Sequence, residues 1–222
     1  MSEPKNPDGS SPLDRLIRRK EEAAKTGRHW TGGGDARPRR RLPPGQHKTI
    51  KWPVLDLGNQ PNIAPKDWTF SVAGHVTHPI KWTWNDFMAQ PQETVTSDIH
   101  CVTAWSRFDN LWQGVSARHF LDVVKPKPTA KFLIFHGYDG YTTNVPIEHF
   151  AASDTIVVHS WNGAPLTREH GGPVRVVIPH LYFWKSTKWL KYVLFNDNEV
   201  PGYWEVRGYN AVGDPWREER YG

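Results

Sequence analysis

The residue with the most distinctive chemistry in this chain is its one cysteine, Cys101, among 222 residues. It lies in the stretch DIHCVTAWS, which predicts a strand that runs into a turn. A lone thiol can form neither an internal disulfide nor a cysteine-rich zinc site. Three roles stay open from this residue alone: a buried apolar side chain, a nucleophile, or the one soft protein ligand of a metal whose other ligands come from a cofactor.

Two later segments combine positive charge with groups that could bind an anion. In the stretch HGGPVRVVIP, two glycines follow a histidine, and an arginine opens an apolar strand. A buried arginine needs a partner, which is either a protein carboxylate or a ligand phosphate. In the stretch WKSTKW, two lysines flank two hydroxyl side chains, which fits either a solvated turn or a phosphate-binding loop. The candidate residues are His170, Arg175, Ser186, Thr187 and Lys188.

Two further segments place polar side chains beside glycines. Asp139 lies in the stretch FHGYDGYTTN, where an apolar strand is expected to enter a glycine-rich turn. This is either an ordinary turn or one that presents donors and acceptors to a ligand. Tyr209 follows Gly208, and it is either a core tyrosine with a bonded hydroxyl or one whose hydroxyl faces a cleft.

The elements that must position these residues are mostly strands. Runs of β-branched and aromatic residues predict the strands, and the short helical patterns between them begin at residues able to start a helix. The expected strands are Trp68–Val76, Val95–Trp105, Lys131–His136, Thr155–Ser160, Val174–Ile178 and Tyr192–Phe195. The expected helical segments are Trp84–Met88 capped by Thr83, Ala117–Val124 capped by Ser116, and a turn from Pro146 to Ala151.

We expect an α+β fold in one domain that follows a basic arm. Strands interrupted by short helices, with 19 prolines and 18 glycines, indicate α+β rather than a regular doubly wound sheet. Ser11 and Pro12 open a short helical pattern that ends near Gly27, and an irregular linker follows. Residues 1–44 are therefore predicted to form a basic helix and linker, and residues 45–222 the domain.

Composition narrows the class of protein. The chain has 12 tryptophans and a net charge of +5, but many of its basic residues lie ahead of the expected domain, which is typical of a solvated arm. We therefore do not expect nucleic acid as the partner. No apolar run approaches the roughly 18 residues that a membrane span needs, and the first residues lack a signal-peptide pattern. The expectation is a soluble, cytoplasmic protein.

The order of the motifs points to a known family. The patterns Cys-Val-x-Ala-Trp-Ser, Trp-x-Gly-Val, Phe-x-Gly-x-Asp, His-Gly-x-Pro-Val-Arg-Val-Val-x-Pro and Lys-Ser-x-Lys-Trp-Leu follow one another along the chain. Together they resemble the molybdenum domain of the sulfite oxidase family over about residues 68–209. The stretch from Cys101 to Gly114 is most similar to the branch of the bacterial methionine-sulfoxide-reductase catalytic subunit.

The resemblance implies a cofactor and assigns residues to it. Members of the family hold one molybdenum through the dithiolene of a single pyranopterin and through one cysteine thiolate, which Cys101 matches. A soft thiolate suits a metal whose other sulfur ligands come from the cofactor. The family pattern places Asp139, His170 and Arg175 against the pterin and its phosphate, with Ser186, Thr187 and Lys188 closing on the same group. Tyr209 matches a catalytic tyrosine near the metal.

The sequence also departs from the family. Sulfite oxidases carry an arginine four residues after the cysteine, which helps to attract an oxyanion, and here that position is Trp105. Arg107 is a candidate catalytic substitute for it. The N-terminal cofactor loop has no clear counterpart, and His47 is the candidate cofactor-binding residue there. These departures argue against sulfite as the substrate.

The resemblance therefore predicts a molybdopterin-dependent oxidoreductase that transfers an oxygen atom, with two electrons, to or from a small sulfur- or nitrogen-containing oxide. Its expected partners are a small-molecule substrate and an electron donor or acceptor protein. The alternative is a non-catalytic protein that stores or carries the molybdenum cofactor. A basic nucleic-acid-binding protein with a degenerate enzyme domain is a third, weaker alternative.

Overall fold

The computed structural model describes residue 18 and residues 41–222. The helix expected after Pro12 and most of the linker fall outside this range, so the predicted arm of residues 1–44 stays a prediction. Within the described range the fold is built from mixed β-sheets and short helices, as the sequence predicts. No helix of the described residues has the length and apolar character that crossing a membrane requires.

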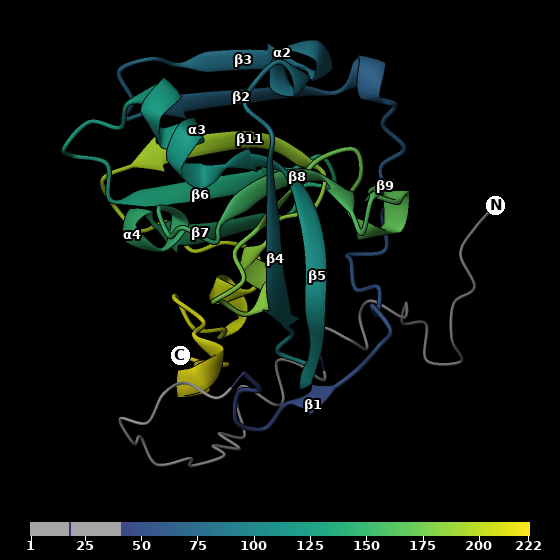
Figure 1. Cartoon of the computed structure of the whole chain (residues 1–222). Coiled ribbons are helices and arrows are strands. Elements are labelled where there is room, and N and C mark those ends of the chain that lie inside the picture. The colour runs from purple at the N-terminus through teal and green to yellow at the C-terminus, as the bar shows by residue number, and fades with distance from the viewer. Residues whose placement is uncertain (1–17, 19–40) are drawn as a thin grey trace, which may run out of the picture.

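A five-stranded sheet forms one layer of the molecule (Figure 1). Its strand order is β3-β2-β11-β6-β7. Strand β11 pairs in parallel with β2, and the other pairs are antiparallel. The strands are β2 (Thr69–Gly74), β3 (Ile80–Thr83), β6 (Phe132–Gly137), β7 (Thr142–Pro146) and β11 (Leu190–Asn196).

The second sheet is organised around β5 (Trp105–Ser116), the longest strand of the described residues. Strand β4 pairs with it along one side, while β1 pairs with its start and β8 with its end on the other side. The hairpin of β4 and β5 crosses the five-stranded sheet and extends toward β1 and the C-terminal segment (Figure 1). The remaining strands are β1 (His47–Lys48), β4 (Glu93–His100), β8 (Ile156–Trp161), β9 (Ala164–Pro165) and β10 (Arg175–Val177).

The helices begin where the sequence predicts. Helix α2 (Trp84–Met88) has a capping box, since the Thr83 hydroxyl accepts from the backbone N–H of Asp86 while the Asp86 carboxylate accepts from that of Thr83. Helix α3 (Ala117–Val124) is capped by Ser116. Helix α4 (Ile147–Phe150) follows Pro146. Short 3-10 helices complete the set: η1 (Pro65–Asp67), η2 (Arg168–His170), η3 (Phe183–Lys185), η4 (Glu205–Arg207) and η5 (Pro215–Arg217).

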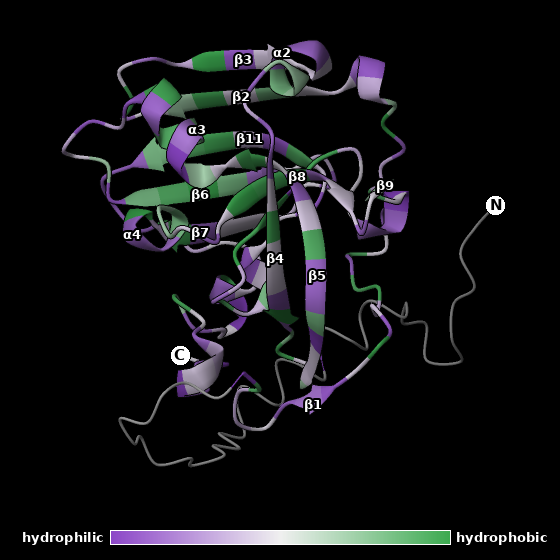
Figure 2. Cartoon of the chain, in the orientation of Figure 1, coloured by the Kyte–Doolittle hydropathy of each residue, from purple (hydrophilic) through white to green (hydrophobic). Residues whose placement is uncertain are grey.

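The main core lies between the five-stranded sheet and the helices. Phe120 of α3 packs against Phe70 of β2, and Phe150 of α4 packs against Phe135 of β6, with ring centroids 5.6 Å apart in both pairs. The apolar residues concentrate on strands β2, β6 and β11, where the sheet meets the helices (Figure 2). Burial of these large aromatic side chains is the dominant favourable contribution to folding.

One expected strand proves to be two. The strand predicted over Val95–Trp105 ends at His100, and residues 101–104 form a turn before Trp105 begins β5. The long strand β5 was not predicted, because it carries polar residues such as Arg107, Asp109 and Gln113. Pairing with neighbours on both sides stabilises it despite this composition.

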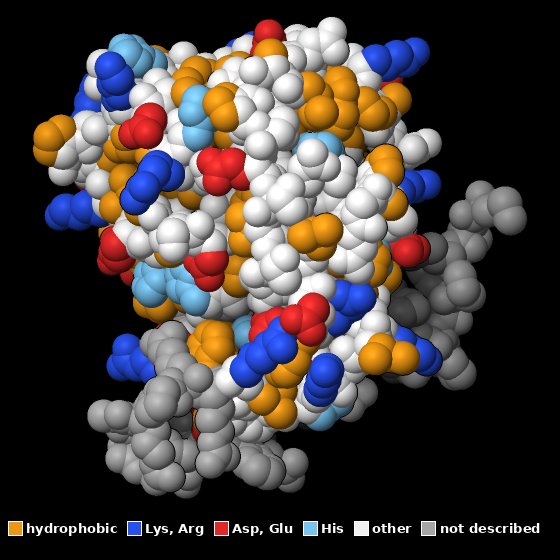
Figure 3. All heavy atoms as spheres, viewed as in Figure 1, with side chains coloured by type: hydrophobic (Ala, Val, Ile, Leu, Met, Phe, Trp, Pro, Cys, Tyr) orange, Lys and Arg blue, Asp and Glu red, His pale blue; other side chains and the backbone are white. Residues whose placement is uncertain are grey.

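The surface of the described residues carries charges of both signs. On the face shown in Figure 3, lysine and arginine side chains are interspersed with aspartate and glutamate rather than gathered in one patch. At the end near β1, for example, Arg41 forms ion pairs with Asp98 and Asp109. This face offers no extended basic surface of the kind that binds a phosphate backbone.

Candidate active site

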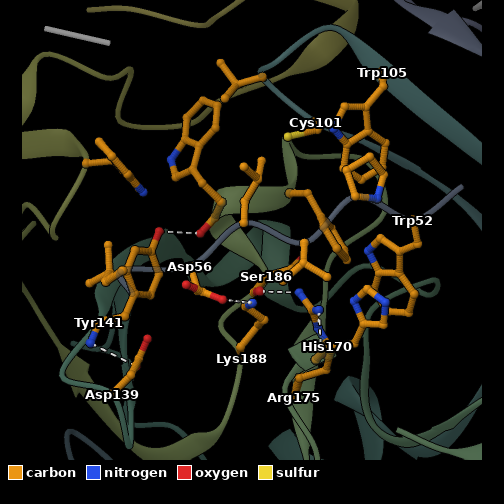
Figure 4. A pocket seen from close by; sticks show the side chains of 18 residues that line it. Trp52, Asp56, Cys101, Trp105, Asp139, Tyr141, His170, Arg175, Ser186 and Lys188 are labelled. Atoms are coloured by element: carbon orange, nitrogen blue, oxygen red, sulfur yellow. Dashed lines mark hydrogen bonds and ion pairs between the residues drawn. The ribbon is translucent and has the colours of Figure 1, made fainter. Parts of the chain in front are cut away.

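A cavity lies where the β4–β5 turn, the β6–β7 turn and the segment after β10 meet (Figure 4). With its open mouth it encloses about 780 Å³. Residues far apart in sequence form its walls, from residue 52 to residue 204. Six of the residues proposed from the sequence line it: Cys101, Asp139, His170, Arg175, Ser186 and Lys188.

The turn after β4 holds the thiol of Cys101 in the cavity wall. The backbone N–H of Cys101 donates to the carbonyl of Trp105 (2.9 Å), and the N–H of Ala104 donates back to the carbonyl of Cys101 (3.0 Å). Ala104 adopts a left-handed conformation with φ of 72°, which closes the turn tightly. The Thr103 hydroxyl donates to the Cys101 sulfur at 3.1 Å. The sequence analysis missed this contact, which depends on the local turn geometry.

Arg175 brings a buried positive charge to the opposite end of the cavity. Its side chain donates to the carbonyls of His170 (2.9 Å) and Ser186 (2.7 Å) and lies over the ring of Phe183. No carboxylate of a described residue forms an ion pair with it, and burial lowers the pKa of the guanidinium below its ordinary value. Of the two partners left open by the sequence, the protein carboxylate is therefore absent among the described residues.

Lys188 adds a second, partly buried cation beside Arg175. Its ammonium donates to the carbonyl of Glu169 (2.8 Å) and lies 3.8 Å from a carboxylate oxygen of Asp56. Burial and the neighbouring charge of Arg175 lower the pKa of Lys188 to about 8. Two cations that destabilise each other in a buried site provide a favourable position for an anion.

His170 contributes a neutral imidazole ring to the cavity wall, and Asp139 contributes a carboxyl group that accepts a hydrogen bond. Burial, together with the charges of Arg175 and Lys188, lowers the pKa of His170 to about 4, so its ring is neutral at physiological pH. Its imidazole stacks on Trp52, with centroids 3.8 Å apart and planes 6° apart. Asp139 accepts from the backbone N–H of Tyr141, and burial raises the pKa of its carboxyl above the ordinary value.

Ser186 and Thr187 behave differently although they are adjacent. The Ser186 hydroxyl accepts from the backbone N–H of Ile178, and its side chain reaches the cavity. The Thr187 side chain is buried outside the cavity lining, and its hydroxyl oxygen has no hydrogen-bond partner among the described residues. Its predicted contact with the cofactor therefore has no counterpart in the cavity wall and stays a prediction.

Two more proposed residues, His47 and Arg107, lie outside the lining. His47 is exposed on β1, where the short strand pairs with the start of β5. Arg107 lies 4.6 Å over the ring of Trp161 and donates to the side-chain oxygen of Asn110. Neither residue is among those that line the cavity, so the roles proposed for them stay predictions.

Tyr209 lies one layer behind the cavity. Its ring packs edge-on against Trp184, with centroids 5.1 Å apart, and against Trp204 at 5.2 Å. Both of those tryptophans line the cavity. Burial raises the pKa of the Tyr209 hydroxyl well above its ordinary range, so the hydroxyl keeps its proton at neutral pH. Tyr209 is not among the lining residues, and its proposed role near the metal stays a prediction.

Sequence reasoning missed the N-terminal wall, which residues 52–57 form. The sequence places the candidate loop between Gln46 and Val54 and singles out His47 in it, whereas the lining begins five residues after His47, with Trp52. Trp52 also packs edge-on against Trp112 and Trp161, which fixes the segment across the site. The sequence feature that could have indicated this wall is Trp52 with Pro53, followed by apolar residues in an otherwise polar stretch.

The residues present fit a molybdenum–pyranopterin cofactor. Cys101 supplies a soft sulfur donor at one end of the cavity, and the buried Arg175 and the partly buried Lys188 supply positive charge for a phosphate at the other. Within the part of the chain that the structure describes, no group of three or more histidine, cysteine, aspartate or glutamate side chains is placed to hold a metal ion.

Comparison with known proteins agrees with this chemistry. Residues 57–204 match the family described as oxidoreductase molybdopterin binding domain, which covers more than half of the chain. The chain is 44% identical over 182 residues to the uncharacterized oxidoreductase YuiH of Bacillus subtilis, covering 82% of this chain and 92% of that protein.

Two more distant relatives are longer proteins, of which this chain covers only part. A putative protein-methionine-sulfoxide reductase subunit, YedZ1 of Azospira oryzae, is 33% identical over 144 residues, which cover 64% of this chain and 54% of that protein. A nitrate reductase [NADPH] of Fusarium oxysporum is 27% identical over 194 residues, covering 70% of this chain and 21% of that protein.

A solved structure shows the same fold. The sulfane dehydrogenase SoxCD of Paracoccus pantotrophus aligns with a TM-score of 0.59 at 22% identity, over 64% of this chain and 41% of that chain. The family match and the identity to YuiH together decide the classification: the chain is a molybdopterin-binding oxidoreductase of the sulfite oxidase family.

Proposed function

We propose that this protein binds one molybdenum–pyranopterin cofactor and carries out two-electron oxygen-atom transfer to or from a small sulfur- or nitrogen-containing oxide. The observation that carries the proposal is the cavity that Cys101 shares with the buried cation of Arg175 and the partly buried cation of Lys188. The names of two relatives, a nitrate reductase [NADPH] and a putative protein-methionine-sulfoxide reductase subunit, support this reaction class.

Each lining residue has a role that its chemistry supports. The thiolate of Cys101 binds the metal, and the Thr103 hydroxyl, which donates to that sulfur, orients it and withdraws electron density. Arg175 and Lys188 bind the phosphate with charge-assisted hydrogen bonds. Asp139 accepts from the N–H groups of the pterin ring, and the neutral ring of His170 lines the same pocket.

When bound, the molybdenum supplies the two-electron redox chemistry, which no side chain of this cavity provides. The chain contributes binding, orientation and exclusion of water. Trp52, Phe183, Trp184 and Trp204 give the cavity aromatic walls, which lower the local dielectric and strengthen polar interactions inside it. We also propose that a separate protein donates or accepts the electrons and that the protein works in the cytoplasm.

The experiment that tests the proposal starts with protein expressed in a host that makes the molybdenum cofactor. Molybdenum and pterin are each expected at about one per chain, measured by elemental analysis and by the fluorescence of the oxidised pterin. The dithionite-reduced protein should then be reoxidised by a sulfur or nitrogen oxide. Protein that holds molybdenum but is reoxidised by none of these compounds would instead be a cofactor carrier.

Replacing Cys101 by serine tests the metal ligand. The change substitutes a hard oxygen donor for a soft sulfur donor. Turnover and the thiolate-to-metal absorption bands are expected to disappear, while the fold and the pterin content largely persist. The visible spectrum, circular dichroism and pterin content of Cys101→Ser are the measurements. Full activity in this variant would disprove the assignment.

A further inference from the structure

The polar end of the cavity carries two carboxyl groups as well as two cations. Asp56, Asp139, Arg175 and Lys188 all line the cavity and gather at this end (Figure 4). Burial raises the pKa of Asp139, and the nearby charge of Asp56 adds to this effect. A cofactor phosphate would bring further negative charge, and like charges in a partly buried site oppose each other. The phosphate and the carboxylates therefore compete for the same two cations.

Asp56 is the carboxylate that forms an ion pair with one of these cations. Its Oδ2 lies 3.8 Å from Nζ of Lys188, and each of the two side chains is 14% exposed (Figure 4). The distance is too long for a hydrogen bond, so the attraction of opposite charges holds the pair together. The two groups can therefore separate without the loss of a hydrogen bond between them.

The loop holds the Asp56 carboxylate in this position. Its Oδ1 accepts from the backbone N–H of Gly58 at 2.9 Å, and its Oδ2 accepts from the side-chain amide of Gln60 at 2.7 Å. Aspartate commonly bonds the backbone two residues on in this way, which orients its side chain. The carboxylate is thus placed beside Lys188 before any ligand binds.

The segment that carries Asp56 is attached to the rest of the protein on both sides of it. Trp52 stacks on His170, and the carbonyl of Gln60 accepts from the side chain of Arg168 at 2.8 Å. Both partners belong to the short helix η2. Because the backbone is held on either side, only the Asp56 side chain has to turn for the ion pair to separate.

We propose that Asp56 is a placeholder for the cofactor phosphate: it is the counter-charge of Lys188 in the cofactor-free protein and gives up this cation when the cofactor binds. The inference rests on the proposed function, because it presumes that the cofactor enters this cavity. A buried cation without a counter-charge is costly, and the exchange gives Lys188 one in both states. Asp56 therefore stabilises the cofactor-free protein and weakens its binding of phosphate.

Asp56→Asn tests the proposal, since it removes the charge and keeps an oxygen that can accept from Gly58. The Kd of the cofactor-free protein for inorganic phosphate, measured by phosphorus NMR titration, should fall by about 10-fold. The melting temperature without phosphate should also fall, because Lys188 loses its counter-charge. Asp122→Asn, at an exposed position of α3, changes the net charge equally and is the matched control. Its Kd should equal that of the wild type.

A second background tests whether Asp56 acts through Lys188. In Lys188→Met protein, Asp56→Asn should no longer lower the melting temperature, and its effect on the Kd for phosphate should shrink to about 3-fold or less. The reason is that the cation for which carboxylate and phosphate compete is gone. An undiminished effect on both quantities would show a general repulsion of anions and would overturn the placeholder role.

The holoenzyme gives an independent readout. Asp56→Asn protein from a host that makes the cofactor should hold at least as much molybdenum and pterin per chain as the wild type. It should also release pterin no faster on gentle heating, measured by the fluorescence of the oxidised pterin. A variant that loses its pterin would make Asp56 a ligand of the bound cofactor instead, which overturns the inference.

The outcomes separate this inference from the proposed function. Wild-type protein that holds neither molybdenum nor pterin refutes both. Full cofactor content together with an unchanged Kd for phosphate in Asp56→Asn overturns the inference and leaves the proposed function standing. Phosphate binding that is undetectable in every variant of a protein with full cofactor content has the same meaning. If Asp56→Asn does not fold, Asp56→Ser also removes the charge and decides with the same expectations.

Discussion

Lys185 and Lys188 lie on the same short segment and are both largely removed from solvent. The protein neutralises the charge of Lys185 but leaves the charge of Lys188 partly uncompensated. Lys185 has a fully buried side chain, and its ammonium is 2.6 Å from the Glu205 carboxylate, whose side chain is 3% exposed. It also donates to both side-chain and backbone oxygens of Asn144 and to the carbonyl of Ala211. Its charge is neutralised entirely within the protein.

Lys188 and its neighbour Arg175 are not neutralised in this way. Arg175 meets carbonyl oxygens, and the nearest carboxylate to Lys188, that of Asp56, is 3.8 Å away. The comparison teaches that a buried cation is not by itself evidence of a ligand site. What marks the site is a buried cation whose charge the protein leaves partly uncompensated, at the wall of a cavity.

The largest effect on stability should come from breaking the neutralised pair. Lys185→Met leaves the Glu205 carboxylate buried without its cation, which should lower the free energy of unfolding by about 3–5 kcal/mol. Denaturant titration of the cofactor-free protein measures this. The double variant Lys185→Met/Glu205→Gln should recover part of the loss, because no unpaired charge remains. Lys191→Met, on the exposed side of β11, is the matched control, with an expected change within about 0.5 kcal/mol.

Arg175→Met should change the stability of the protein little and weaken its binding of the cofactor strongly. Because the guanidinium lacks a carboxylate partner, its loss should change the stability of the cofactor-free protein by no more than about 1 kcal/mol. Cofactor binding should weaken by about 10- to 100-fold, since charge-assisted hydrogen bonds to a phosphate contribute roughly 1.5–3 kcal/mol. Molybdenum and pterin per folded chain should fall together. Full occupancy in this variant would remove the distinction between the two cations.

The smallest effect should appear in the pH dependence of the cofactor-free protein. The pKa of Lys188 falls from 10.5 to about 8 on folding, so between these values the unfolded chain binds more protons than the folded one. The free energy of unfolding should therefore rise with pH across this window, by an amount on the order of 1–3 kcal/mol. Below pH 8 both states are protonated, and the folded state carries the full cost of burial.

Two comparisons check the pH prediction. Lys188→Met should flatten the rise, and so should saturation with the cofactor, because its phosphate keeps the ammonium protonated. A wild-type curve that matches the Lys188→Met curve from pH 8 to 10 would show that Lys188 is not titrating in this range.

The parts of the fold that depend on local chemistry could be predicted from the sequence. Helices α2 and α3 begin at the expected caps, because Thr83 and Ser116 bond to backbone groups three residues away. Strand β5 could not be predicted in this way. Its polar residues match no simple alternation, and its stability comes from partners distant in sequence, such as Trp161, which pairs with Trp112.

The residues of the candidate site also fall into two groups, those that the sequence could predict and those that it could not. Residues within strongly patterned blocks, such as Cys101, Arg175 and Lys188, could be proposed and do share one cavity. Trp52 could not, because what places it in the site is stacking on His170, a contact between distant parts of the chain. Tyr209 belongs to a recognisable block, but the sequence does not reveal that its ring packs against Trp184 and Trp204 outside the cavity lining.

The wide spread of the cavity walls along the chain, from residue 52 to residue 204, fixes the order of events during biosynthesis. The ribosome must release almost the whole polypeptide before these segments can come together, and such distant contacts form late in folding. We therefore expect the cofactor to enter after translation, once the segments that carry Cys101, Arg175 and Lys188 have come together.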